Sequence, residues 1–494
     1  MRSSWILGFV SVLSLCTACG GEDVPSETPG PPQPSYLPAD GVTIERVAIY
    51  QGLERDLMKD GTAVLNGVPV VAGRDALIRV FYRTDEGYDG DPVLAKLHVS
   101  DVPDSGAGGG GATDAAKESS FEIAGVLGSQ SNGDNLATTL NFDVPGESLT
   151  STATFRVEVL RAAAQTSGAN EKASHPTTGY QQLGAVAVGS KVRIVLVPVR
   201  YDADGSGRLP DTSPEQLAIY RDLLWKLYPV PEVELRVAEP FPWSTAVAPT
   251  GAGWGELLSA MSSHRQKSGA EFDEYYYGLF RATETFEKFC TGGCIAGLSQ
   301  LALNAFNDDA RVGIGIGFSG EGVALTAAHE IGHEHGRGHV PCGTNQGLDP
   351  GYPHVNGAIG LLGYDLVQRQ LMPSSMKDYM SYCDPKWTSD FTYEAMFERI
   401  KAVNLAAMNL LQVERKSYER LLIDIDGSVR WLGPIEFALP PEGRPEKVQL
   451  EKAGESIEII GQFLPFSHLD GGTVYFPSTP ETTKLRIRGR QVSR

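Results

Sequence analysis

Apolar residues in the first third of the chain follow the alternating pattern of β-strands. Short runs rich in β-branched residues recur there, and turn residues separate them. The runs are Val42–Tyr50, Ala76–Tyr82, Val93–Val99, Thr138–Val144 and Ala153–Leu160. A glycine tract at 106–111 is typical of a loop between two of them. We therefore expect residues 41–190 to form an immunoglobulin-like β-sandwich that serves as a spacer or binding module.

Beyond Lys191, continuous apolar runs alternate with stretches of helical periodicity. Val192–Val199 suits a largely buried strand, and Ser213-Pro214-Glu215 suits the start of a helix. Further strands are expected at 233–237, 275–280 and 312–318, and further helices at 254–264, from about 322, and at 391–403. This alternation predicts a central α/β (α+β) domain over residues 191–414.

The end of the chain returns to a β pattern. Strand-like runs occupy 421–425, 429–432, 447–450, 456–460 and 473–476, with an Asp426-Gly427 turn after the first. We expect residues 415–494 to form a small C-terminal β domain. It carries no chemical signature, and the lone His468 decides nothing. The predicted fold class is thus multidomain, with the central α/β domain between an N-terminal β-sandwich and this β domain.

Composition and charge say little about the fold, but they limit the possible binding partners. The chain has 494 residues, of which 41% are hydrophobic and 21% charged, as in ordinary globular proteins. Its formal net charge of −19 argues against a nucleic-acid partner, because phosphates would repel such a surface.

The N-terminus has the pattern of an export signal. Arg2 precedes an apolar run that is too short to span a bilayer. Residues 15–21, Leu-Cys-Thr-Ala-Cys-Gly-Gly, resemble a bacterial lipobox, which predicts a signal peptide over 1–18 and a lipid on Cys19. Cys16 stands where Leu is usual, so lipidation of Cys16 and a plain secretory signal remain alternatives. A Pro/Gly-rich tether would follow over 19–40, and the protein would be an outer-membrane or surface lipoprotein of the bacterial cell envelope.

The remaining cysteines fit an oxidising compartment. They are Cys290, Cys294, Cys342 and Cys383, and an even number there suggests two disulfides with three possible pairings. We favour Cys290–Cys294, which closes a tight Thr-Gly-Gly loop, together with Cys342–Cys383. A zinc ion held by all four thiolates is the competing idea, but the spacing does not give two CxxC knuckles.

The stretch 329–339 carries the chemistry of the chain. His329 and His333 are four residues apart, so on a helix they share one face and can bind one ion, with Glu330 beside it. Gly336 can end the helix with a positive φ and bring His339 in as a third nitrogen ligand. Three neutral imidazoles and one open position are typical of a catalytic zinc site. His335 points off this face, and we expect it at the surface or behind the ligands.

A second possible cation site is weaker. Asp202-Ala203-Asp204-Gly205-Ser206-Gly207 resembles the start of a calcium-binding loop. Position 12 is Ser213 rather than Glu, so the EF-hand pattern fails and calcium is not supported.

Taken with the stretch 378–383, the 329–339 motif resembles that of the metzincin zinc peptidases. Met380 matches the methionine of their Met-turn, and the resemblance covers about residues 190–405. Tyr382 resembles the tyrosine of the serralysin and astacin branches, which implies a zinc ligand that swings away to stabilise the oxyanion; a tyrosine packed beneath the site is the alternative. Val340 departs from those branches, so the subfamily stays open, and we expect a bacterial lipoprotein branch. Residues 294–298 look like the upper-rim strand that binds substrate.

This resemblance implies an exported zinc endopeptidase that hydrolyses extracellular proteins or glycoproteins. One catalytic zinc, held by His329, His333 and His339, would activate a water, and Glu330 would act as general base. A surface binding or adhesion lipoprotein with a vestigial zinc site is the alternative from another class. A further alternative is that the same site hydrolyses an amide bond outside peptides.

Overall fold

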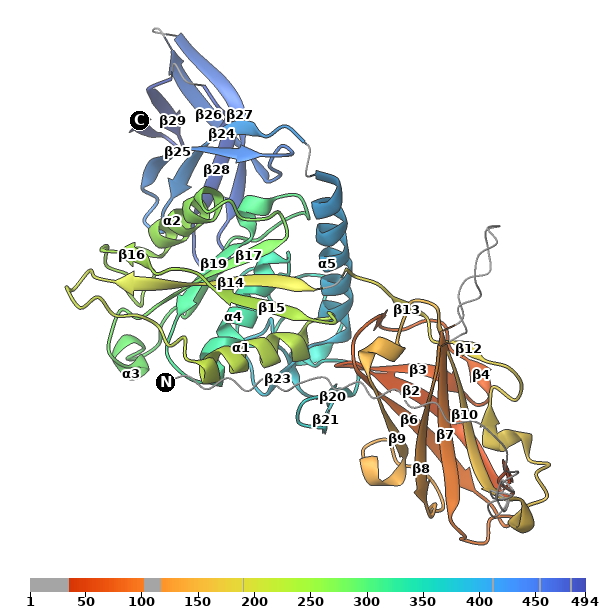
Figure 1. The fold of residues 1–494 in the computed structure, drawn as a ribbon. Coiled ribbons are helices and arrows are strands. Elements are labelled where there is room, and N and C mark those ends of the chain that lie inside the picture. Colours follow the sequence, from red (N-terminus) through yellow and green to blue (C-terminus); the bar gives the residue numbers. More distant parts are fainter. Residues whose placement is uncertain (1–34, 102–116, 190, 411–412, 453–454, 480–481) are drawn as a thin grey trace, which may run out of the picture.

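The computed structural model describes residues 35–101, 117–189, 191–410, 413–452, 455–479 and 482–494. An N-terminal β region, a central region with most of the helices and a C-terminal sheet follow one another along the chain (Figure 1). The predicted signal peptide, the lipidation site Cys19, most of the tether and the glycine tract lie outside the described residues. Within them, no helix is both long and apolar enough to cross a membrane.

The N-terminal region consists of two sheets around one apolar core. The strands of the first, in spatial order, are β4 (Thr62–Ala63), β3 (Glu54–Lys59), β2 (Val42–Tyr50), β6 (Ala76–Thr84) and β9 (Leu140–Val144). Those of the second are β1 (Tyr36–Pro38), β10 (Ala153–Ala162), β7 (Val93–Asp101) and β8 (Lys117–Gly125), with β11 (Ser174–His175) and β12 (Gln181–Gln182) beside β10. The alternating apolar positions of these strands, such as Val47 and Leu97, fill the core. The expected strands of this region are confirmed.

A mixed sheet forms the centre of the molecule. Its order is β15 (Val233–Val237), β14 (Val192–Tyr201), β17 (Glu274–Phe280), β19 (Val312–Ile316) and β18 (Gly297–Ser299), with β16 (Phe241–Trp243) also on β14. The neighbouring strands are parallel except β18, which runs antiparallel at the edge. The helices here are α1 (Pro214–Leu227), α2 (Trp254–Lys267), α3 (Phe286–Phe289), α4 (Glu321–Glu334) and α5 (Asp390–Leu410). Ser213 caps α1, as its position before Pro214 predicts.

Two short strand pairs lie in the stretch between α4 and α5. They are β20 (Gly363–Asp365) with β21 (Gln370–Met372), and β22 (Lys377–Asp378) with β23 (Lys386–Trp387). Another parallel pair, β5 (Val70–Val71) with β13 (Ala185–Val186), lies in the N-terminal region where the chain leaves it. The stretch after α4 is therefore mostly loop, as its sequence suggested.

The C-terminal region is one antiparallel sheet of seven strands. Its order is β25 (Val429–Phe437), β24 (Lys416–Ile423), β28 (Gly472–Pro477), β27 (Glu455–Pro465), β26 (Arg444–Lys452), β29 (Lys484–Ile487) and β30 (Arg490–Ser493). One face has its own apolar core, which includes Leu421 and Val474. Leu422 and Phe466 instead belong to the core of the central region, so this sheet packs directly on the centre.

The expected fold class, with a central α/β domain of metzincin-like build, is wrong. Strands make up 39% and helices 19% of the described residues, which are mostly β and divided among many sheets, without a clear α/β metzincin core among them. The strand–helix alternation before residue 320 led to that expectation. The chain after α4 does not continue it, because loops and two-stranded pairs follow there.

Candidate metal centre

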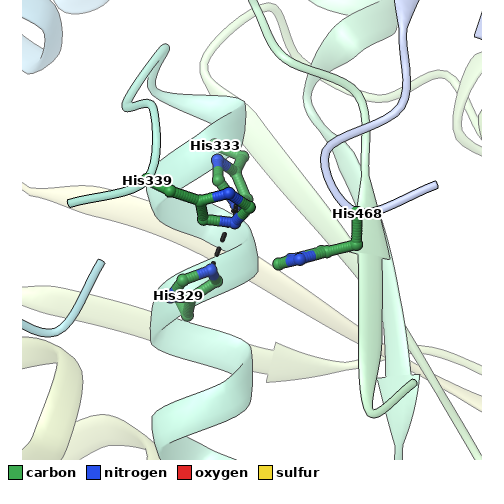
Figure 2. A group of neighbouring side chains, drawn as sticks. All are labelled: His329, His333, His339 and His468. Atoms are coloured by element: carbon green, nitrogen blue, oxygen red, sulfur yellow. Dashed lines mark hydrogen bonds between the residues drawn. The ribbon is translucent and has the colours of Figure 1, made fainter. Parts of the chain in front are cut away.

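Helix α4 positions two histidines one turn apart, and the chain reversal after it brings the third (Figure 2). Gly336 has φ +83, and a Cβ there would lie 2.6 Å from the carbonyl oxygen of Ala302, so only glycine fits this turn. His339 then returns toward the helix, where its backbone N–H donates to Gly347 at 2.9 Å. The helix and the glycine turn of this motif are therefore enough to bring the three histidines together.

The three imidazoles converge through their Nε2 atoms. That of His333 lies 3.1 Å from that of His329 and 3.2 Å from that of His339. Nitrogen ligands about 2.0–2.1 Å from one tetrahedral ion lie about 3.3 Å apart. The three atoms thus have the spacing that a single bound ion requires.

The opposite ring nitrogens fix which atom faces the ion. The Nδ1 atoms of His329, His333 and His339 donate to the backbone carbonyls of Tyr379, Arg337 and Gln346 at 2.9, 2.6 and 2.6 Å. A ring that donates from Nδ1 keeps its Nε2 lone pair free for a metal. Backbone groups therefore hold all three rings in the ligating tautomer.

Burial also keeps these rings neutral. Loss of solvent lowers the pKa of His329 and of His333 well below 6.5, and it lowers the pKa of His339 to about 4. Neighbouring histidines lower them further. Neutral imidazole is the form that binds a metal ion.

A fourth histidine joins the three from the far end of the sequence. His468 lies in the β27–β28 loop (residues 466–471), and its ring points toward the other three (Figure 2). One nitrogen from each of the four residues lies within 4.8 Å of the others. The buried cluster His329, His333, His339 and His468 can hold a metal ion. Sequence reasoning missed His468, because no motif or spacing relates it to residues more than a hundred positions away.

Glu330 lies against the cluster and is buried. Its Oε2 accepts from Ser299 Oγ at 2.8 Å and from Ser467 Oγ at 3.3 Å, and its Oε1 lies 2.7 Å from Nε2 of His468. Gly297 of β18 lets the carboxylate approach the strand, because a Cβ there would lie 2.4 Å from Oε1. The carboxylate is therefore fixed beside the imidazoles by both the rim strand and the β27–β28 loop.

Met380 lies directly beneath α4. A Cβ on Gly332 would approach its sulfur to 2.4 Å, so this glycine admits the methionine between the two helical histidines. Asp378 holds the turn, accepting from the backbone N–H of Met380 at 2.7 Å and of Ser389 at 2.9 Å. This turn also supplies the backbone carbonyl of Tyr379, which orients the ring of His329.

Both expected disulfides are present, and one borders the centre. Cys290–Cys294 closes its short loop, and Cys342–Cys383 joins the segment after His339 to the segment after Met380. Disulfides are typical of proteins in oxidising compartments, and they indicate export.

Tyr382 adjoins Cys383 and lies at the rim of the cluster with 46% of its surface exposed. Its ring centroid is 5.2 Å from that of His339, and its hydroxyl is hydrogen-bonded to Nδ1 of His468. Burial of the hydroxyl end, and then the charge of Glu330, raise the pKa of Tyr382. The hydroxyl therefore stays protonated at neutral pH, and its oxygen can still accept a hydrogen bond from His468.

Of the two positions expected for His335, the structure has the one inside the molecule and not the one at the surface. Only 1% of it is exposed, and its ring stacks on Tyr275 with centroids 4.1 Å apart. Its Nδ1 donates to the carbonyl of Ile331 at 2.7 Å, inside the core behind α4. It does not belong to the metal cluster.

Two cavities border the cluster, and His468 lines both of them. The larger, about 720 Å³, is lined by Glu330, Tyr382, the rim residues 294–297 and the apolar side chains of Phe286 and Leu325. The other, about 550 Å³, is lined by His333, by most of the β27–β28 loop and by Arg444 and Arg488. Both include His468 and Gln346 in their walls.

Comparisons with known proteins add little. No family model matches the chain, and no curated protein matches it. One solved structure that it matches is named "Structure of a chaperone-substrate complex", with 13% identity and a TM-score of 0.23. The match covers 55% of this chain and 38% of that one, so it spans well under half of that chain's length. A likeness at this level carries no argument about fold or function.

Proposed function

We propose that the chain is an exported zinc endopeptidase, related to the metzincins through its histidine and Met-turn motifs. One observation carries the proposal: three neutral imidazoles converge through Nε2, with a buried carboxylate beside them. Nitrogen ligands of this type suit zinc better than they suit calcium or magnesium, which prefer oxygen.

The roles of the residues follow from their contacts. His329, His333 and His339 would hold the zinc, which when bound polarises a carbonyl and lowers the pKa of water. Glu330, placed beside them, would take the proton from the attacking water and pass it to the leaving nitrogen. Tyr382, half exposed at the rim, can turn its hydroxyl toward the substrate oxyanion once it leaves His468. Met380 supplies an apolar support and no chemistry.

The substrate and the location are also proposals. The rim at 294–298 and the adjoining cavity suit an extended peptide, so we propose protein or glycoprotein substrates outside the cell. The lipobox-like residues before Cys19 favour a lipoprotein of the bacterial cell envelope, attached to the membrane by that lipid. We propose no nucleic-acid partner, given the net charge of −19.

The test is the conservative change Glu330→Gln in the purified full chain. We expect it to keep its zinc and to cleave casein at least about 100-fold more slowly, because general bases contribute about 10²–10⁴-fold. A chelator should abolish cleavage by the parent, and added zinc should restore it.

Glu321→Gln is the matched control, since Glu321 is an exposed glutamate on the same helix. It should cleave at the parent rate. Cleavage by Glu330→Gln at the parent rate would remove Glu330 from the chemistry. Specific binding of a glycan or protein, with no cleavage of any substrate in a protein library, would favour the adhesion function instead.

A further inference from the structure

The β27–β28 loop occupies the edge of the central sheet beside the metal centre. Ser467 donates its backbone N–H to Ser299 O at 2.9 Å, and its Oγ accepts from Ser299 N at 3.0 Å. Gln300 and Phe466 form an antiparallel bridge next to this pair. Since β18 is the outermost strand of its sheet, the loop takes the backbone positions that an added peptide strand would use.

An apolar anchor holds the loop in this place. Phe466 is 5% exposed and belongs to the core of the central region. Its ring lies so close to α2 that a Cβ on Gly255 would approach it to 3.0 Å. The loop is therefore packed against the centre as part of the fold, and the position of His468 follows from that packing.

The four imidazoles of the cluster are arranged almost regularly. The six distances between their ring centroids all lie between 4.7 and 5.2 Å. His468 repeats the pattern of the other three when its Nδ1 donates to the Tyr382 hydroxyl oxygen, because this tautomer leaves the Nε2 lone pair free. Its Nε2 is buried and makes no hydrogen bond, although Oε1 of Glu330 lies 2.7 Å away. A buried imidazole nitrogen that makes no hydrogen bond, on a ring that points toward three others, is placed as a metal ligand would be.

We propose that His468 is a fourth ligand of the metal, through Nε2, and that the β27–β28 loop thereby keeps the centre in a closed, latent state. The regulatory half of this proposal rests on the proposed function. Four protein ligands make a closed site, whereas a catalytic site keeps one position for water or substrate. The loop also binds Glu330 through Ser467 and Tyr382 through Nδ1 of His468, so it contacts both other residues that the reaction needs.

The two cavities also indicate that the β27–β28 loop obstructs substrate binding. An endopeptidase must hold its substrate on both sides of the bond that it cleaves. The β27–β28 loop lines one of the two cavities and, through His468, contributes to the wall of the other, as Gln346 also does for both. Displacement of the loop would remove His468 from both walls and leave more of the cluster open to a substrate. Activation would therefore require the loop to leave, with β27 and β28 still paired in their sheet.

The ligand assignment is tested by zinc K-edge X-ray absorption on the full chain loaded with zinc alone. The parent should show all four imidazoles of the cluster. His468→Ala should lose one, and His468→Asn, which keeps a polar group toward Tyr382, should match it. Zinc affinity should fall roughly tenfold or more, because loss of a mere outer hydrogen-bond partner already costs about 10–100-fold. Asp470→Asn, an exposed change in the same loop, should leave both readouts unchanged. The same imidazole count in the parent and both His468 variants would overturn the assignment.

The latency is tested by casein cleavage with the same proteins. Both His468 variants should cleave roughly tenfold or more faster than the parent and the Asp470→Asn control, because an open position is a requirement of catalysis. Rates equal to or below the parent rate would overturn the latency while leaving the peptidase function in place. If no variant cleaves but the imidazole count still falls by one, the proposed peptidase function fails and the ligand assignment stands.

Discussion

The two β regions at the ends of the chain attach to the centre in different ways. The N-terminal sandwich is joined through backbone carbonyls, above all by Arg74, which donates to Tyr228 O and Val230 O at 2.8 and 2.6 Å. The C-terminal sheet is joined through Phe466 in the central core and through polar side chains at the metal centre. The first contact stabilises the assembly, whereas the second also determines what surrounds the histidines. Two β regions thus differ in their relation to the metal centre, because only the C-terminal one places a loop, β27–β28, beside the histidines.

Of the changes that test this difference between the two β regions, Phe466→Ala should have the largest effect on stability and zinc binding. Loss of a buried aromatic ring costs about 3–5 kcal/mol of unfolding free energy. It should also weaken zinc binding, because the ring anchors the loop that carries His468. Urea unfolding and zinc competition measure the two effects, and Phe306→Ala, at 41% exposure, is the control. Lost stability with unchanged zinc affinity would show that the anchor does not position His468.

A smaller effect, on stability alone, is expected from Arg74→Ala. The fully buried guanidinium also donates to Trp225 O at 2.7 Å, and each buried carbonyl left without a donor costs about 1–3 kcal/mol. We expect a loss of about 3 kcal/mol in urea unfolding and an unchanged zinc affinity. Arg83→Ala, which removes an exposed arginine of the same region, is the control.

Reduced zinc affinity in Arg74→Ala would contradict the conclusion that the N-terminal sandwich affects stability alone. Tyr228 provides the route by which that could happen, since its hydroxyl donates to the carbonyl of Ala328 in α4 at 2.7 Å. The sandwich would then contribute to the metal centre through this tyrosine.

The smallest effect is expected from Arg369→Ala. Arg369 forms an ion pair with Asp143 of the sandwich, and both side chains are more than half exposed. Solvent and salt screen such a pair, so its removal should change the unfolding free energy by less than about 1 kcal/mol and leave zinc binding unchanged. A larger loss would mean that the sandwich depends on surface charge for its attachment as well as on Arg74.

Much of the local structure could be predicted. The strands β2 and β15 have the predicted ends, and α1 begins at the predicted proline. Both disulfides pair as expected, because the short loop favoured one and the remaining cysteines left the other. The fold class could not be predicted, because the alternation before residue 320 does not say what the following residues build. The sequence left open whether His335 lies at the surface or inside, because the aromatic rings that enclose it come from other elements.

By itself, the sequence determined the grouping of His329, Glu330, His333 and His339. Helical spacing and one glycine turn bring these residues together within eleven positions, whatever surrounds them. Only the tertiary structure decided that His468 joins them. Its position depends on how the C-terminal sheet packs on the centre, and packing between regions distant in sequence leaves no periodicity or spacing along the chain.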